Sequence, residues 1–157
     1  MREKFNYFIC CRVVNKARAL VDNMIRYATI NDLLVLKKYD RHIREAELRD
    51  SLNKNRIIVM ENDGVFMGWL RYNLFWDNTP FINMLYILDS FQGRGCGGQL
   101  LAFFEKEMRE NGHCLILTST LSNERAQFFY RKHGFSDCGS LILPGQPLEI
   151  ILLKNLV

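Results

Sequence analysis

Residues 92–98, QGRGCGG, form a glycine-rich segment between a strand-like apolar run and a strongly helical stretch. The apolar run is FINMLYIL, residues 81–88, and the helical stretch begins near Gly97. Glycine permits positive φ and lets a ligand approach the backbone without meeting a Cβ atom. A loop that leads into a helix N-terminus also presents unpaired N–H groups at the positive end of the helix dipole. The segment therefore predicts a phosphate or diphosphate site, with an unliganded glycine turn as the alternative.

Two common phosphate-binding loops do not fit this segment. The spacing Gly93-x-Gly95-x-x-Gly98 satisfies the dinucleotide fingerprint. That motif also includes an acidic residue about twenty positions further along the chain, at the end of the next strand. The next strand-like run is CLILTST, residues 114–120, and it has no carboxylate. No GxxxxGK[ST] string occurs, so a P-loop is unsupported as well. The pattern that remains is Gln92-x-x-Gly95-x-Gly97.

This pattern resembles the Q/R-x-x-G-x-G/A motif of the GCN5-related N-acetyltransferases (GNAT), whose loop holds the acetyl-CoA diphosphate. A second segment agrees, because Asn123, Ala126 and FFYRKHGF, residues 128–135, resemble that family's N-x-x-A-x-x-F-Y-x-K-x-G-F motif. The resemblance covers about residues 25–154 and is weak before residue 56. It implies an acyltransferase that moves an acetyl group from acetyl-CoA to a primary amine of a small molecule or protein, by direct attack in a ternary complex.

The order of elements predicts a single α+β domain with a mixed sheet. Strands are expected at residues 24–28, 56–62, 65–76, 81–88 and 114–120, with two closing strands around CGSLILP and LEIILLK. Helices are expected after Thr29, at 44–53, from about 97 to a stop at Gly112, and at 124–133. Hairpin turns are expected at Asp63-Gly64 and at Asn78-Thr79-Pro80.

The connection from residues 81–88 through a helix to residues 114–120 predicts a right-handed crossover between parallel strands. The expected sheet has about six to seven strands, mostly antiparallel, and about four helices pack on it. The resemblance further implies that the central parallel pair splays apart to hold CoA.

Cofactor-binding residues follow from the resemblance. Backbone groups near Ile87 and Leu88 are expected to hold the pantetheine and polarise the thioester carbonyl. The diphosphate would be bound by the amides of Gln92, Gly93, Arg94, Gly95, Cys96, Gly97 and Gly98. Asn123 is expected to contact the cofactor, to cap the last helix, or to do both. The Cys96 side chain is expected to pack in the core rather than to react.

The catalytic residues are only partly assigned by the sequence. Tyr130 occupies the F-Y position of the family's second motif, so the resemblance implies that it is the acid, and its phenol has an ordinary pKa above that of a thiol. A buried aromatic residue that packs on the sheet is the alternative. No carboxylate lies in FINMLYIL, which puts the family's usual base in doubt. Three carboxylates and a water chain that includes Tyr86 are the candidates for the base. The carboxylates are those of Glu61, Asp77 and Glu149.

The acceptor is not identified by the sequence. Trp69, Tyr72, Phe75 and Trp76 crowd one strand and would line an acceptor pocket, a homodimer face or the core. A catalytically silent CoA-binding regulatory module is the alternative function, motivated by the missing strand carboxylate. A protein-interaction domain is a third interpretation, favoured only if CoA does not bind.

Composition narrows the class further. A length of 157 residues, 48% hydrophobic and 24% charged, suits one globular domain. The net charge of +4 suits an anionic ligand, but no motif indicates nucleic acid. Five cysteines without CxxC spacing and three scattered histidines predict neither a disulfide framework nor a metal site.

Cellular location and domain limits are also expectations from the sequence. No apolar run reaches the length of a membrane span, so a cytoplasmic protein is expected. Residues 1–23 are expected to form an N-terminal appendage of uncertain role, and residues 24–157 the acetyltransferase domain. A natural start at Met24 and an N-terminal helix packed on the domain or on a second subunit are the alternatives for this segment.

Overall fold

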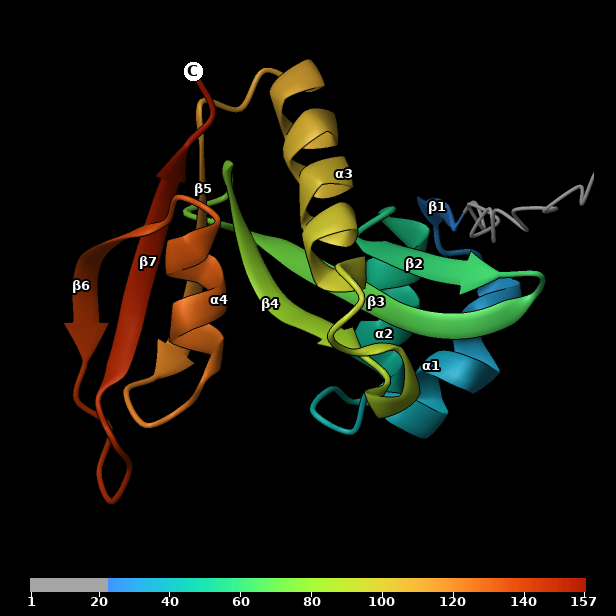
Figure 1. The fold of residues 1–157 in the computed structure, drawn as a ribbon, viewed down its shortest axis with the longest axis horizontal. Coiled ribbons are helices and arrows are strands. Elements are labelled where there is room, and N and C mark those ends of the chain that lie inside the picture. The colour runs from blue at the N-terminus through green and yellow to red at the C-terminus, as the bar shows by residue number, and fades with distance from the viewer. Residues whose placement is uncertain (1–22) are drawn as a thin grey trace, which may run out of the picture.

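The computed structural model describes residues 23–157 (Figure 1). The expected appendage therefore falls, except for Asn23, outside the described residues. The chain forms a seven-stranded mixed sheet in the order β1-β2-β3-β4-β5-β7-β6. Helices α1 and α2 cover one face, and α3 and α4 cover the other (Figure 1). This arrangement confirms the predicted α+β fold with a mixed sheet.

The N-terminal part of the domain is an antiparallel meander with two helices inserted after its first strand. Its elements are β1 (Met24–Tyr27), the 3-10 turn η1 (Ile30–Asp32), α1 (Leu33–Tyr39), α2 (Glu45–Asn53), β2 (Ile57–Asn62), β3 (Val65–Phe75) and β4 (Thr79–Ile87). The Asp32 carboxylate accepts the Thr29 N–H at 2.7 Å, as the capping-box pattern predicts.

One of the two hairpin turns differs from the sequence prediction. Asp63 and Gly64 both have positive φ, as expected for the β2–β3 turn. Between β3 and β4, Trp76 and Asp77 are the residues with positive φ, and Pro80 lies inside β4. The predicted Asn78-Thr79-Pro80 turn is therefore two residues too late. A tryptophan with positive φ is uncommon, so the sequence carries no signal for this turn.

The C-terminal part begins with the crossover after β4. Its elements are η2 (Asp89–Phe91), α3 (Cys96–Glu110), β5 (Leu115–Leu121), α4 (Ala126–Lys132), β6 (Ser136–Leu141) and β7 (Glu149–Asn155). Gly112, with φ 83°, follows the end of α3 as predicted. Helix α4 begins two residues later than predicted, and the Glu124 carboxylate, before the helix, accepts the Thr120 hydroxyl at 2.9 Å. Strand β6 ends at Leu141, three residues before Pro144, the last residue of the segment CGSLILP around which the strand was predicted.

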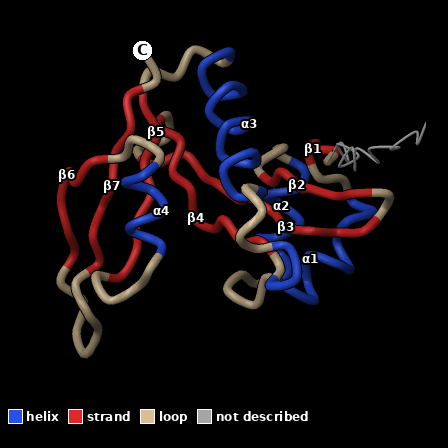
Figure 2. The backbone as a smooth tube through the Cα atoms, in the orientation of Figure 1, coloured by secondary structure: helices blue, strands red, loops and turns tan. Residues whose placement is uncertain are grey.

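The parallel strands β4 and β5 pair only briefly. Their register holds two residue pairs, Phe81 with Leu117 and Ile82 with Thr118. The next residue of β4, Asn83, has no partner in the register with β3, where the pairing shifts by one residue. Such a bulge bends a strand and ends its pairing. Beyond it β4 follows β3 and β5 follows β7, so the two strands diverge (Figures 1 and 2). The expected splay is confirmed.

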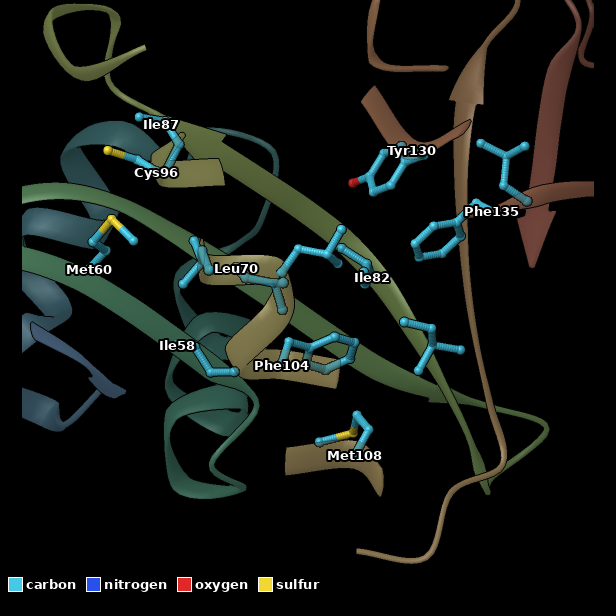
Figure 3. Close-up of a cluster of buried hydrophobic side chains, with 14 of the residues drawn as sticks. Ile58, Met60, Leu70, Ile82, Ile87, Cys96, Phe104, Met108, Tyr130 and Phe135 are labelled. Atoms are coloured by element: carbon cyan, nitrogen blue, oxygen red, sulfur yellow. The ribbon is translucent and has the colours of Figure 1, made fainter. Parts of the chain in front are cut away.

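Two apolar clusters, one on each face of the sheet, hold the elements in place. The apolar residues predicted at helical spacing along α3 pack against the sheet: Leu100, Leu101, Phe104 and Met108 are buried and Phe103 is partly buried. Figure 3 shows Phe104 and Met108 in this cluster. The opposite cluster packs α1 and α2 on β2 and β3. No helix among residues 23–157 is long and apolar enough to cross a membrane.

Candidate active site

A pocket of about 570 Å³ opens where β4 and β5 separate. It lies between the end of β4, the glycine loop and α4. Eight residues of the predicted site line it, from three separate segments: Ile87, Gln92, Gly93, Gly95, Cys96, Gly97, Gly98 and Tyr130. Its volume is in the range of small-molecule sites. We call it the cofactor pocket.

The glycine loop leaves open space at the start of α3. Gly95 is the N-cap of the helix with φ 83°, and a Cβ atom there would meet nothing within 4 Å. Gly93 has φ 72° and is equally open. The first N–H groups of a helix have no partner within the helix and attract anions. This loop therefore fits a diphosphate, because its open backbone, its helix N-terminus and its place on the pocket coincide.

Gly97 and Gly98 have a different role, because both face α4. A Cβ atom on Gly97 would lie 3.3 Å from the Phe129 ring, and one on Gly98 would lie 3.0 Å from the His133 imidazole. The two aromatic rings contact each other, with centroids 4.6 Å apart. Glycines at these positions let α4 pack closely on the start of α3. His133 and the neighbouring Lys132 then line the cofactor pocket and add donors that suit an anionic ligand.

Backbone alternation along β4 determines which peptide groups face the pocket. The Leu88 N–H donates to the Met67 carbonyl at 2.8 Å, so these two residues form a hydrogen-bonded pair of the β3–β4 ladder. In an antiparallel ladder the next pair, Gly68 with Ile87, directs its groups away from the partner strand. The Ile87 N–H therefore faces the gap, and the Leu88 N–H does not. Of the two residues predicted to polarise a thioester, only Ile87 presents its amide.

The Gln92 side chain ties the loop to the strand. Its Nε2 donates to the Ile87 carbonyl at 2.8 Å and to Asp89 Oδ1 at 3.0 Å. The same Asp89 oxygen accepts the Tyr86 hydroxyl at 2.9 Å. This hydrogen bond raises the pKa of Tyr86, whose ring is 40% exposed. Gln92 thus fixes the end of β4 through its side chain, a role that the motif alone did not indicate.

A second pocket, of about 520 Å³, lies on the opposite face of β4. It is lined by β3, β4, the segment after α1, and η2: Tyr39, Arg41, His42, Trp69, Met84, Tyr86, Leu88, Asp89 and Ser90. We call it the acceptor-side pocket. Tyr86 also lines the cofactor pocket, so the two spaces meet at this residue.

A buried ion pair supports this second pocket. The Asp40 carboxylate is buried and accepts Arg71 Nε at 2.9 Å and Trp69 Nε1 at 3.2 Å. Trp69 in turn packs against Tyr86 in a tilted arrangement, with ring centroids 5.4 Å apart. The buried Asp40 carboxylate therefore fixes the Trp69 ring, and Trp69 contacts the Tyr86 ring in the wall of the pocket.

Comparison with known proteins identifies the family. The sequence profile of the Acetyltransferase (GNAT) family matches residues 26–135. The chain belongs to this family. It is an acyltransferase, and acetyl-CoA is its co-substrate. No curated protein matches the chain in sequence.

Solved GNAT structures share the fold at low sequence identity. Ard1 from Thermoplasma volcanium is 16% identical, with a TM-score of 0.75 over 86% of this chain and 98% of that one. The ribosomal-protein-S18-alanine N-acetyltransferase from Escherichia coli is 15% identical, with a TM-score of 0.72 over 86% and 94%. The PaiA N-acetyltransferase from Thermoplasma acidophilum, solved with coenzyme A, is 18% identical, with a TM-score of 0.71 over 85% and 99%.

Within this GNAT domain, Tyr130 extends from α4 between the two diverging strands. Its side chain is buried, and Figure 3 shows its hydroxyl pointing toward β4. Burial raises the pKa of the phenol. The tyrosine is therefore a packed aromatic residue and a lining residue of the cofactor pocket at once. At neutral pH it is protonated, as an acid must be.

Three predicted cofactor residues do not line the cofactor pocket: Leu88, which lines the acceptor-side pocket, Arg94 and Asn123. Arg94 and Asn123 are exposed and do not line the cofactor pocket, so their contacts with CoA stay predictions. Asn123 is not the N-cap of α4, because that position belongs to Arg125. The Cys96 side chain is buried in the cluster beneath α3, as the packing interpretation expects.

None of the three predicted carboxylate bases lines either pocket. Glu61 pairs with Arg26 at the other end of the sheet, and Asp77 lies in the β3–β4 turn. Glu149 begins β7, opposite Leu121. The carboxylate that does line the acceptor-side pocket is that of Asp89. Asp89 directly follows the FINMLYIL run, whose last residue in the printed register with β3 is Ile87. Its position directly after the strand is the signal that could have indicated it.

The four aromatic residues predicted as candidates for an acceptor pocket lie in three environments. Trp69 lines the acceptor-side pocket, whereas Tyr72 packs on Phe104 on the opposite face, with centroids 5.0 Å apart. Phe75 and Trp76 are exposed at the hairpin. Only one of the four residues predicted to line an acceptor pocket therefore does so.

Proposed function

We propose that the enzyme transfers the acetyl group from acetyl-CoA directly to a primary amine that enters through the acceptor-side pocket. The observation that carries this proposal is the meeting of two pockets, on opposite faces of β4, at Tyr86. Because β5 has diverged from β4 here, no strand separates the two spaces on that side. An amine and a thioester held in the two pockets would face each other across the end of β4.

Acetyl-CoA supplies an activated acetyl thioester, and the chain supplies the groups that bind and polarise it. The amides around Gly95 bind the diphosphate, and the free edge of β4 binds the pantetheine. The Ile87 N–H donates to the thioester oxygen, where negative charge develops. Tyr130 holds a proton that a departing thiolate needs, because burial raises its pKa.

The acceptor-side pocket favours an amine attached to an apolar group. Its walls are the rings of Tyr39, Trp69 and Tyr86 together with Met84 and Leu88. Aromatic walls bind apolar and aromatic groups well. Since one structural neighbour is a ribosomal-protein-S18-alanine N-acetyltransferase, we include a peptide N-terminus among the candidate acceptors. No observation favours the catalytically silent alternative.

Isothermal titration with acetyl-CoA and with CoA tests the cofactor site. Gly95→Trp should abolish binding, because its side chain enters the diphosphate space. Gly112→Trp is the matched control, since Gly112 also has φ 83° and open space but lies beyond the far end of α3. Loss of binding in both variants would assign the effect to backbone strain. No binding by the intact, folded protein would contradict the proposal.

Thiol release then tests transfer. We would compare 2-phenylethylamine, a short peptide with a free N-terminus, and the same peptide with a blocked N-terminus. Release that depends on a free amine is expected. Tight binding of acetyl-CoA without amine-dependent release would instead support the regulatory module.

A further inference from the structure

We propose that Asp89 binds the ammonium group of the acceptor and takes its proton. This proposal rests on the proposed function and adds the base that the sequence did not assign. Asp89 begins η2, directly beyond the end of β4, and its exposed side chain lines the acceptor-side pocket. Among residues 23–157, Asp89 is the only residue with a carboxylate side chain in the lining of either pocket.

The hydrogen bonds of Asp89 fix it relative to the strand that faces the thioester. Gln92 Nε2 donates both to Asp89 Oδ1 and to the Ile87 carbonyl, at 3.0 Å and 2.8 Å. A single amide nitrogen thus joins the carboxylate to the residue whose N–H faces the cofactor pocket. The carboxylate is thus held in the acceptor-side pocket, hydrogen-bonded to Tyr86, the residue at which the two pockets meet. An amine that enters this pocket must lose its proton before it attacks.

Both described donors to Asp89 are neutral. Tyr86 and Gln92 donate to Oδ1, and in the part of the chain that the structure describes no ion pair includes Asp89. The negative charge is therefore available to a cation from the pocket. The other charged or titratable groups facing this pocket are Tyr39, Arg41 and His42, with the Asp40–Arg71 pair buried beneath.

Tyr86 is a donor in this arrangement and not the base. Its hydrogen bond to Asp89 raises its pKa, so the phenol keeps its proton at neutral pH. A phenol that donates to a carboxylate leaves the carboxylate as the proton acceptor. The second oxygen, Oδ2, receives no hydrogen bond from the described residues and is the atom to which we assign the ammonium.

Atoms and charge balance in the proposed step. One proton passes from the ammonium to Asp89 Oδ2 and then to solvent, and the amine lone pair becomes free. The lone pair forms the C–N bond to the thioester carbonyl carbon, and the C–S bond breaks as the thiolate leaves. The thiolate takes a proton from Tyr130. The second proton released by the nitrogen returns, through solvent, to the Tyr130 phenolate. The products are an amide, CoA thiol and one proton.

Asp89→Asn tests this role, because the amide keeps an oxygen for Tyr86 and Gln92 but cannot accept the proton. For 2-phenylethylamine at neutral pH, kcat/KM should fall about 100-fold or more, as expected for loss of a general base. Acetyl-CoA affinity, measured by titration, should be unchanged. The affinity of 2-phenylethylamine for the CoA-bound protein should fall, which is a readout independent of turnover. Asp77→Asn, in the exposed β3–β4 turn, is the matched control and should change neither.

The acceptor's own pKa separates a base from a structural residue. With 2,2-difluoro-2-phenylethylamine, whose ammonium is more acidic, the defect of Asp89→Asn should shrink. It should also shrink as pH rises. Asp89→Glu should keep more activity than Asp89→Asn.

Three results would overturn the role of Asp89 alone. The first is a normal rate in Asp89→Asn, and the second is a defect of equal size for both amines at every pH. Loss of acetyl-CoA affinity in Asp89→Asn would reassign the effect to the Gln92–Ile87 link and would also overturn it. No transfer to any amine by the intact enzyme would overturn the proposed function and this role with it.

Discussion

Gly68 in β3 lies directly opposite Ile87 in β4, closer than any side chain would permit. A Cβ atom on Gly68 would lie 2.4 Å from the Tyr86 carbonyl oxygen and 3.0 Å from the Ile87 Cα atom. The obstructing atoms are backbone, so they cannot rotate away. The position of the strand end that faces the thioester therefore depends on a glycine in the neighbouring strand.

Gly68→Ala should displace the end of β4. We expect a loss of about 1–3 kcal/mol in the free energy of unfolding, typical of overpacking, together with weaker acetyl-CoA binding. Urea unfolding and isothermal titration measure the two effects. Gly139→Ala is the control, because a Cβ atom there meets nothing within 4 Å in strand β6. Unchanged acetyl-CoA affinity in Gly68→Ala would show that the end of β4 tolerates a shift.

Removing the Asp40 carboxylate should destabilise the fold strongly. Asp40→Ala leaves the Arg71 guanidinium buried without its counter-charge, and losing one partner of a buried pair costs about 3–5 kcal/mol. Asp50→Ala, which removes an exposed pair with Lys54, should cost less than about 1 kcal/mol. Urea unfolding compares the variants. If Asp40→Ala and Asp50→Ala lower the free energy of unfolding equally, the buried Asp40 contributes no more to stability than an exposed carboxylate.

Tyr130→Phe should lower kcat while leaving the acetyl-CoA affinity unchanged, because the ring still fills its buried site. If the phenol is the acid, the loss should be about 100-fold or more. Burial raises the pKa of Tyr130, so the protonated form persists to higher pH than for an exposed tyrosine. Deprotonation of Tyr130 should therefore not lower the wild-type kcat at any pH below about 10. Steady-state rates across this range test both points, and an unchanged kcat in Tyr130→Phe would exclude the role.

Acid should weaken the fold through Asp32. The hydrogen bond from Arg26, and then the Thr29 N–H, lower the pKa of Asp32 below its ordinary 3.8. A lowered folded-state pKa contributes stability above the unfolded-state pKa, and this contribution is lost as pH falls through the folded-state value. Asp32→Asn should thus reduce the urea midpoint at pH 7, and the difference from wild type should narrow below about pH 4. A constant difference across this range would contradict the assignment.

Local signals carried most of what the sequence predicted correctly. The glycine loop, the helix that follows it and the Asp63-Gly64 turn each depend on residues within a few positions. The parallel placement of β5 followed from the helical crossover alone. These predictions agree with the structure because a helix start or a tight turn is determined largely by its own residues.

The remaining features depend on registers and long-range contacts. The unpaired Asn83 shifts the β4 ladder by one residue, and such a shift changes which amide faces the gap. The resemblance, which gave only the approximate position, therefore could not separate Leu88 from Ile87. His133 meets Gly98 only because α4 packs on α3, and the acceptor-side pocket combines β3, β4 and the segment after α1. No pattern within one segment reveals such combinations.

The brief pairing of β4 with β5 has a mechanical consequence. Within the sheet, the pairs at Phe81 and Ile82 alone join strands β1–β4 to strands β5–β7 among the described residues, so the ladder between the two parts is short. A molecule of CoA that contacts both Ile87 and Tyr130 would join the two parts at a second place. A ligand that binds only the folded state raises the free energy of unfolding as its concentration rises. Bound acetyl-CoA would therefore stabilise the contact between the two parts of the sheet. This stabilisation would be lost when CoA leaves, so the protein should be least stable between turnovers.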